Sequence, residues 1–517
     1  MDLTLKITPL SAALVVAAFA SSARADTCSD LAKTGLHDVR IDRASLQQAG
    51  SLPPDEMSAM TGGAPVPTEV GSHCLVQGKI GDREGMNGRY GTRFELRMPQ
   101  DWNGRFLFQG GGGTDGFLAP AIGPIPSTGS RATPGLTRGY AVVSMDGGHD
   151  GLDFAFAADQ QARLDLGYAS IGKITAAAKA LVRAYYGEAP EQSFFMGCSN
   201  GGREAMIAAE RFPLEFDGVV AGNPAFHLSR AALGGVWDVT QWAKVAPRDA
   251  MHTALSQADL ETVANEVLRQ CDALDGREDG IVAAYRQCSF DPEALRGQID
   301  DGRLDALITV MDGARDAGGA RVYSDWPWDP GMAAPGWRTW KLGTAEQPSL
   351  HQTLTVPSTE ALMLTPPQSI PDAPDFAALA RGTADVGGYL DADDTFLTTF
   401  ANRGGKMVIF QGLADPIFSA WDIAQWHDRA EADTGADFAQ LFMVPGMTHC
   451  GGGRDAFEDF DPLTVLEEWT AGGDAPQQMP ASAPSRPGEE MPVCAWPLEA
   501  QYTGEGTGAD SFTCTAG

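Results

Sequence analysis

A serine flanked by glycines is the first feature of this sequence that could do chemistry. Gly197-x-Ser199-x-Gly201 follows an apolar run at residues 193–196, which is predicted to be a strand, and leads into residues 200–211, which are predicted to be a helix. A serine on a tight strand-to-helix turn is exposed as a nucleophile, and small neighbours are needed because the helix packs close to the turn. The motif alone is weak in a chain with 61 glycines. The strand–turn–helix context therefore carries the prediction that Ser199 is a nucleophile.

A nucleophilic serine needs a base and an acid that orients the base. His449 lies in a loop just beyond a predicted strand at residues 441–444, whereas His427 falls in a predicted helix at residues 421–432, where a solvated surface imidazole is expected. Asp415 follows a predicted strand at residues 406–410; its alternative role is an Asx turn, and Asp422 is the reserve acid. Asp415 and His449 are predicted to complete a triad in the order Ser, Asp, His, which is typical of α/β-hydrolases.

Two backbone segments are candidates for stabilising the charge on the substrate oxygen. One N–H donor is expected from Asn200, the residue after the nucleophile. The other is expected from Gly111 or Gly112, in the glycine loop at residues 110–113 after a predicted strand at residues 106–108. Glycines allow a backbone N–H to approach the substrate because no Cβ is in the way. A phosphate loop is disfavoured because no GK[ST] sequence follows.

Two cysteines flank the predicted catalytic residues. Cys198 directly precedes the serine and Cys450 directly follows the histidine. If the serine and the histidine touch, the two cysteines are close enough to bridge. The alternative is a free Cys198 that competes as a nucleophile, but an exported chain is expected to oxidise it.

The elements that must position these residues alternate between strands and helices. Besides the strands already named, residues 141–144 and 218–221 are predicted strands, and residues 171–186 and 420–432 are predicted helices. Such alternation predicts an α/β fold with a mostly parallel sheet covered by helices. The expected core comprises residues 26–224 and 392–517.

Residues 225–391 differ in character and are interpreted as a large inserted lid domain. They hold six of the eleven tryptophans, including Trp340, which is predicted to contact substrate. Tryptophan suits flat aromatic groups, but these residues could equally form the core of the lid. The alternative is a second, independent domain; the sheet pattern that resumes afterwards argues for an insertion.

The N-terminus has the pattern of a secretory signal at residues 1–25, with Lys6, a short apolar run at residues 10–20 and Ala23-Arg24-Ala25 before the expected cut. Its loss would change the net charge from −31 to −32, because the leader carries Asp2 against Lys6 and Arg24. An acidic chain without a basic run argues against nucleic acid and anionic membranes as partners. We expect a periplasmic or secreted protein without a membrane span, and its oligomeric state stays open.

Three motifs together resemble a known family. Gly-Cys-Ser-Asn-Gly-Gly at residues 197–202, Gly-Leu-Ala-Asp at 412–415 and Pro-Gly-Met-Thr-His-Cys at 445–450 are similar to the tannase and feruloyl esterase family of α/β-hydrolases, which includes bacterial hydrolases of mono-hydroxyethyl terephthalate. Spacing alone leaves 105 pairings of the eight cysteines open. The resemblance implies the pairs Cys28–Cys74, Cys198–Cys450, Cys271–Cys288 and Cys494–Cys514.

An acidic segment at residues 271–281 admits two interpretations. Three aspartates within eight residues, with glycines for sharp turns, can wrap a hard cation, although the spacing is not that of an EF-hand. Composition alone favours a solvated acidic turn. The resemblance implies instead a structural Ca²⁺ in the lid, bound by the carboxylates of Asp272, Asp275 and Asp279 and the backbone carbonyls of Arg277 and Ile281.

The predicted function is hydrolysis of small aromatic esters, such as galloyl or feruloyl esters, through an acyl-enzyme. The alternatives are a hydrolase of mono-hydroxyethyl terephthalate or a related diacid monoester, a peptidase on the same fold, and a non-catalytic aromatic- or glycan-binding protein. Family members specialised for the terephthalate monoester supply an arginine after a Gly-Trp-Arg-x-Trp segment, here residues 336–340. No Arg or Lys lies between Lys341 and Arg381. Lys341 or Arg338 is the candidate substitute, and the alternative for either is a solvated residue on the surface. The sequence therefore favours uncharged phenolic esters.

Overall fold

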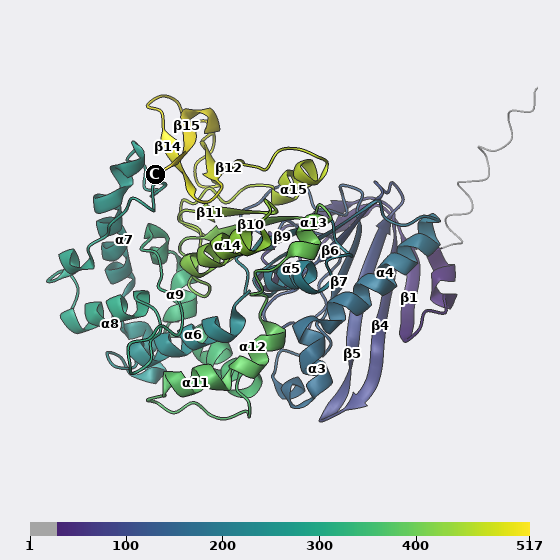
Figure 1. Ribbon diagram of the computed structural model, residues 1–517, viewed down its shortest axis with the longest axis horizontal. Helices are drawn as coiled ribbons and strands as arrows, with labels where there is room; N and C mark the ends of the chain where they lie inside the picture. Colours follow the sequence, from purple (N-terminus) through teal and green to yellow (C-terminus); the bar gives the residue numbers. More distant parts are fainter. Residues whose placement is uncertain (1–27) are drawn as a thin grey trace, which may run out of the picture.

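The centre of the computed structural model, which describes residues 28–517, is one nine-stranded sheet (Figure 1). The predicted secretory signal lies outside the described residues. The strands, in their order across the sheet, are β1 (Val39–Gln47), β4 (His73–Gly85), β5 (Gly88–Pro99), β7 (Ala141–Met145), β6 (Arg105–Gln109), β8 (Gln192–Cys198), β9 (Gly218–Gly222), β10 (Lys406–Gly412) and β11 (Ala439–Val444).

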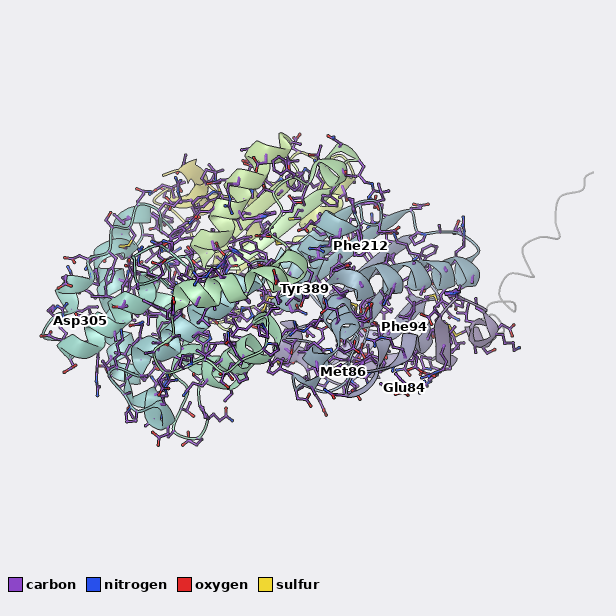
Figure 2. All side chains as sticks on the ribbon, turned by 60° about the horizontal axis from the view of Figure 1, so that its bottom comes forward. Glu84, Met86, Phe94, Phe212, Asp305 and Tyr389 are labelled. Atoms are coloured by element: carbon purple, nitrogen blue, oxygen red, sulfur yellow. A yellow bond between two sulfur atoms is a disulfide. The ribbon has the colours of Figure 1, made fainter. Side chains whose placement is uncertain are left out.

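Six of these strands, from β7 to β11, are parallel, whereas β1, β4 and β5 add an antiparallel edge. The parallel strands lie where the buried apolar runs predict them, so the predicted α/β fold class is confirmed. The long hairpin of β4 and β5 has no such run: Phe94 is fully buried, but Met86 at its turn is 62% exposed (Figure 2). A hairpin with one solvent-exposed end lacks the continuous apolar run by which a buried parallel strand is predicted from sequence.

Side chains of the parallel strands alternate between two hydrophobic layers, as the pleat of a sheet requires. In β8, Phe195 packs on one face and its neighbours Phe194 and Met196 pack on the other. The first face is covered by α4 (Ser170–Tyr186), α5 (Asn200–Arg211) and α14 (Ala420–Thr434), and the second by α15 (Pro462–Thr470).

The segment between β9 and β10 adds no strand to the sheet, because β9 pairs directly with β10. Its helices gather beside the parallel strands (Figure 1). They are α6 (Leu228–Trp242), α7 (Gln257–Cys271), α8 (Asp301–Met311), α9 (Pro335–Lys341), η8 (His351–Thr355), α10 (Val356–Ser358), η9 (Thr359–Met363), α11 (Phe376–Gly382), α12 (Ala384–Leu390) and α13 (Thr398–Asn402), with short single turns between them. Among the described residues, no helix is long and apolar enough to cross a membrane.

Contacts between this helical segment and the core include the end of α12. Tyr389 lies at the junction (Figure 2), and the hydroxyl of Tyr389 accepts a 3.5 Å hydrogen bond from Arg163. Two hairpins, β12–β13 (Gln478–Ser482 and Glu490–Cys494) and β14–β15 (Leu498–Tyr502 and Phe512–Ala516), complete the C-terminus.

The described residues contain four disulfides and no free cysteine. The pairs are the ones that the family resemblance implies: Cys28–Cys74, Cys198–Cys450, Cys271–Cys288 and Cys494–Cys514. Four disulfides are typical of a protein folded in an oxidising compartment.

Candidate active site

Ser199 stands on the turn between β8 and α5. Its backbone has φ 61° and ψ −124°, a conformation that non-glycine residues rarely adopt. The surroundings hold it there: a Cβ added at Gly197 would lie 2.6 Å from the backbone of Gly201, and one added at Gly201 would lie 2.6 Å from the carbonyl oxygen of Gly111. The sharp turn keeps the half-buried Ser199 side chain at the surface of a pocket, which is the geometry of a nucleophile elbow.

His449 and Asp415 come from the loops after β11 and β10. The Nδ1 atom of His449 lies 2.9 Å from Oδ2 of Asp415. The buried Asp415 carboxylate also accepts hydrogen bonds from the side chain of Asn223 (2.7 Å) and from the backbone N–H of Ile417 (2.8 Å). Burial by itself would raise the pKa of Asp415, but the His449 imidazole and these donors lower it below its usual value. An ionised Asp415 keeps the proton on Nδ1 and leaves Nε2 of His449 as the acceptor.

The competing acid and base lie elsewhere. Asp422 faces His227, whose Nδ1 is 3.2 Å from its carboxylate. His427 was expected to be a solvated surface residue, and this is wrong: it is 2% exposed, and its Nε2 lies 3.2 Å from the carbonyl oxygen of Ala439. The helical pattern of α14 does not reveal that this face packs on β11.

The Cys198–Cys450 disulfide draws the serine and histidine loops together. Its Cα atoms are 6.1 Å apart although the two residues are separated by 252 positions. Gly62 lies against the bond, where an added Cβ would be 2.9 Å from Cβ of Cys450. A disulfide directly beside Ser199 and His449 limits how far their loops can separate.

A small pocket with a mostly apolar lining opens beside Ser199. Trp340 and Phe418, which line it, place their ring centroids 5.9 and 5.4 Å from that of His449. Of the six tryptophans in the helical segment, all within the described residues, Trp340 is the one that lines the pocket, and its contact with substrate stays a prediction. The remaining wall is formed by Gly113, Thr114, Asn200, Ala225, Leu228, Ala231, Ala232, Leu354, Thr355, Ser358, Met363 and Ile417.

The two segments predicted to donate N–H groups to the oxyanion differ in whether their N–H groups already have partners. Asn200 is the first residue of α5, so its N–H has no carbonyl partner within the helix. Gly111 is a wrong prediction, because its N–H donates a 2.9 Å hydrogen bond to the buried Glu204. Gly113 and Thr114, further along the same loop, line the pocket.

Gly112 stays a prediction as an oxyanion donor. Its Cα faces the backbone of Met60, where an added Cβ would lie 1.7 Å from the carbonyl oxygen. The glycine loop is therefore wedged between α5 and the segment before β3 (Thr68–Val70), and no side chain fits at this position.

A buried polar cluster beneath the glycine loop was missed from the sequence. The side-chain amide of Asn200 donates to Asp115 and Glu204, and the guanidinium of Arg203 donates to the carbonyl oxygen of Leu390 in α12. Burial raises the pKa of Asp115 well above its usual range, and the charge of Glu204 raises it further. The only signal was the Arg–Glu pair that interrupts the small and apolar residues of α5.

No charged side chain lines the pocket among the residues that the structure describes. Lys341 is fully buried, with Nζ 2.5 Å from Asp238 and 4.0 Å from the ring centroid of Trp326. Arg338 donates to the backbone carbonyls of Leu255 (2.8 Å) and His252 (2.7 Å). The interpretation that either cation contacts a substrate carboxylate is therefore wrong, because both are already engaged by the protein.

The acidic segment at residues 271–281 begins at the end of α7 with a single 3-10 turn, Asp272–Asp275. Arg486, between β12 and β13, donates a 2.6 Å hydrogen bond to the backbone carbonyl of Asp279. Burial raises the pKa of Asp275 to about 6, and the charges of Asp279 and Asp272 contribute to this shift. Clustered carboxylate oxygens suit a hard divalent cation, and in this respect the residues fit Ca²⁺. Part of that charge is offset by Arg277, whose Nε lies 3.2 Å from Asp279.

A different group is the tighter acidic cluster within the described chain. Ligand atoms of His227, Asp391 and Asp393 lie within 4.8 Å of one another. The Asp391 carboxylate already accepts hydrogen bonds from the backbone and hydroxyl of Ser229. These hydrogen bonds from Ser229 give Asp391 a structural role at the end of α12.

Comparisons with known proteins show the family of this chain. The family described as "Tannase and feruloyl esterase" matches residues 86–515. A mono(2-hydroxyethyl) terephthalate hydrolase from Piscinibacter sakaiensis is 35% identical, over 89% of this chain and 88% of the relative.

Two solved structures have the same fold. Feruloyl esterase B from Aspergillus oryzae superposes with a TM-score of 0.78 at 21% identity, covering 95% of this chain and 100% of the other. Tannin acyl hydrolase from Aspergillus niger gives a TM-score of 0.72 at 21% identity, covering 96% of both chains.

Proposed function

Because the chain belongs to the tannase and feruloyl esterase family and is therefore an esterase, we propose that it is an exported serine esterase that hydrolyses uncharged esters of aromatic acids. One observation carries the proposal: Ser199, on its strained turn, lines an apolar, uncharged pocket, and two aromatic residues of the same pocket, Trp340 and Phe418, lie beside the His449 ring that pairs with Asp415. A chemically complete site also argues against a non-catalytic binding protein. The four disulfides support export.

The proposed mechanism assigns one role to each of these residues. Nε2 of His449 removes the proton of Ser199 as the hydroxyl oxygen attacks the ester carbonyl, and then protonates the leaving alcohol. The backbone N–H of Asn200, at the positive end of α5, stabilises the tetrahedral oxyanion together with a backbone N–H from the glycine loop. Water activated by His449 then hydrolyses the acyl-enzyme. Asp415 stabilises the imidazolium that forms twice in this cycle.

The pocket suits the acyl group of an aromatic ester. Trp340 and Phe418 offer flat surfaces beside His449, and α6 contributes small side chains, such as Ala231 and Ala232, that leave room for a ring. We propose that residues 225–391 act as a lid that supplies most of these contacts.

Hydrolysis of mono-hydroxyethyl terephthalate is the second candidate function, because the 35% identical relative carries that name. Its substrate is a carboxylate anion, and the engaged positions of Lys341 and Arg338 speak against it here. A buried anion without a partner is costly.

The test compares kcat/KM across methyl gallate, methyl ferulate, methyl benzoate and mono-hydroxyethyl terephthalate, with Ser199→Ala as the inactive control. Hydrolysis of the neutral aromatic esters that disappears in the variant supports the proposal. Activity confined to non-aromatic esters, or retained in the variant, contradicts it.

We further propose that the acidic turn holds a structural Ca²⁺ through the carboxylates of Asp272, Asp275 and Asp279 and the carbonyls of Arg277 and Ile281. A bound cation would neutralise the mutual repulsion of the carboxylates and tie the end of α7 to the turn. We expect it to act on stability and to take no part in the ester chemistry, because none of these five residues lines the Ser199 pocket.

A further inference from the structure

Two carboxyl groups, those of Asp115 and Glu204, lie buried together beneath the glycine loop. Asp115 is 1% exposed and Glu204 is 0% exposed. The side-chain amide of Asn200 donates to both of them, to Oδ1 of Asp115 and, at 3.3 Å, to Oε1 of Glu204. A Cβ added at Gly111 would lie 2.4 Å from Oδ2 of Asp115, so this carboxyl group packs directly against the loop. One amide therefore bridges two acids that have no access to water.

The cations near these two acids cannot neutralise both of them. Arg203 is the cation whose charge acts on both acids. The hydrogen bonds of its guanidinium go to Oδ1 of Asn200 and to three backbone carbonyls. The next acid, Asp146, has its own partner in Arg93 at 2.6 Å. Two carboxylates beside one guanidinium would leave an uncompensated charge in a dry interior, and two such groups commonly hold a proton instead.

The hydrogen bonds indicate which of the two acids holds this proton. Both oxygens of Glu204 accept N–H groups, Oε2 from the backbone of Gly111 at 2.9 Å and Oε1 from Asn200. Among the described residues, no N–H or O–H donates to the buried Oδ2 of Asp115. Burial raises the pKa of Glu204, but Arg203, the Gly111 N–H and a hydrogen bond from the Asp115 side chain oppose the rise. Asp115 is therefore the acid that donates, and Glu204 is the carboxylate that accepts.

This pair of acids joins the two segments that the proposed mechanism uses as oxyanion donors. Glu204 binds the glycine loop through Gly111, and both acids bind the side chain of Asn200, whose backbone N–H opens α5. The loop and the helix are in direct contact here, because a Cβ added at Gly201 would lie 2.6 Å from the carbonyl oxygen of Gly111. An oxyanion donor must lie about 3 Å from the charged oxygen, so a small shift of either segment would weaken it.

We propose that Asp115 is a protonated acid at neutral pH that donates to the ionised Glu204, and that the two are positioning residues for the oxyanion hole. This inference rests on the proposed function and names what fixes the two donor segments. Neither side chain lines the pocket, so neither touches the substrate. With one proton the pair carries one negative charge, which Arg203 offsets. A second charge would push the carboxylates apart, and Gly111 and Asn200 would move with them.

Infrared spectroscopy tests the proton, because the C=O stretch of a protonated carboxylic acid is separate from the amide and carboxylate bands. The spectrum of wild type minus that of Asp115→Asn should show one such band at mildly alkaline pH. Asparagine keeps a donor toward Glu204 and an oxygen toward Asn200, so this variant should fold. Asp146→Asn is the matched control: burial raises the pKa of Asp146 to about 6 against the opposing effect of Arg93, so Asp146 is ionised at this pH and should give no band.

Kinetics test the positioning role. Glu204→Leu removes the acceptor of the Gly111 N–H, whereas Glu204→Gln keeps an oxygen for it. Active sites are counted with a fluorophosphonate, which reacts with the catalytic serine, because a role in folding alone would lower their number and leave kcat per site unchanged. For methyl ferulate, kcat per site should fall about tenfold or more in the Leu variant, with KM changed less than about twofold, since a displaced donor costs part of the roughly hundred- to thousandfold effect of a deleted one. The Gln variant should recover most of this loss.

The outcomes separate the parts of the inference. The absence of an acid band in the Asp115→Asn difference spectrum would overturn the protonated Asp115. A wild-type kcat per site in Glu204→Leu, or an equal loss in the Leu and Gln variants, would overturn the positioning role. If wild type hydrolyses no aromatic ester, or if Ser199→Ala still hydrolyses them, the proposed function fails and the positioning role fails with it, whereas the infrared band reports the proton independently of activity.

Discussion

Placing a cation in the pocket should change which esters the enzyme accepts. Leu354 lines the Ser199 pocket and is half-buried in η8. Leu354→Arg would therefore add a guanidinium to a pocket that no charged side chain lines among the described residues. The wild-type enzyme should hydrolyse monomethyl terephthalate at least about tenfold less efficiently than methyl ferulate, the worth of one modest charged contact.

The size of the gain follows from the surroundings of Leu354. A hydrogen bond to a charged group contributes about 1.5–3 kcal/mol, or roughly ten- to hundredfold in kcat/KM. Because the position is only half-buried, solvent screens the charge and we expect the lower end of this range. The gain should also shrink as salt is added.

The assay is the ratio of kcat/KM for monomethyl terephthalate to that for methyl ferulate, measured at low and at high salt. Leu354→Gln is the matched control, with a polar side chain but no charge. The reasoning is refuted if wild type prefers the monoester, or if the Gln variant gains as much as the Arg variant.

The remaining predictions concern the triad, the Cys198–Cys450 disulfide and the acidic turn. Ser199→Ala and His449→Ala should each leave less than about a thousandth of the ester hydrolysis rate, whereas His427→Ala should lower the melting temperature with little effect on kcat, because His427 packs under β11; an inactive but stable His427→Ala would mean that the wrong base was chosen. Replacing Cys198 and Cys450 by Ala should lower kcat by about tenfold or more through loss of alignment, and the same change at Cys494 and Cys514 should affect stability alone, so equal kcat losses would contradict this role of the disulfide. A strong chelator should lower the melting temperature through loss of Ca²⁺, and the decrease should be larger at pH 8 than at pH 5. The pKa of Asp275 is raised to about 6 in the folded protein, so protonation stabilises the metal-free turn at low pH. That stability is lost as the pH rises through about 6. A chelator shift that is absent, or larger at pH 5, would return residues 271–281 to the solvated-turn interpretation.

The sequence alone determined the elements whose pattern is local. The buried strands β8, β10 and β11 are short apolar runs, and the tight turn at Ser199 requires small neighbours, so both could be predicted from residue types. The same holds for the positions of Asp415 and His449, because in a parallel sheet the loops after successive strands meet at one edge.

Only the tertiary structure decided which polar groups are free. Gly111, Lys341 and Arg338 were reasonable candidates from their positions in the sequence, but Glu204, Asp238 and two backbone carbonyls already occupy them. The burial of His427 escaped prediction for the same reason, since a helical pattern does not say what the helix packs against. A hydrogen bond joins residues far apart in the chain, and its partner is set by packing. The chemistry of the reacting residues was therefore local in the sequence, whereas the polarity of the pocket emerged only when α6, α9 and η8 came together around it.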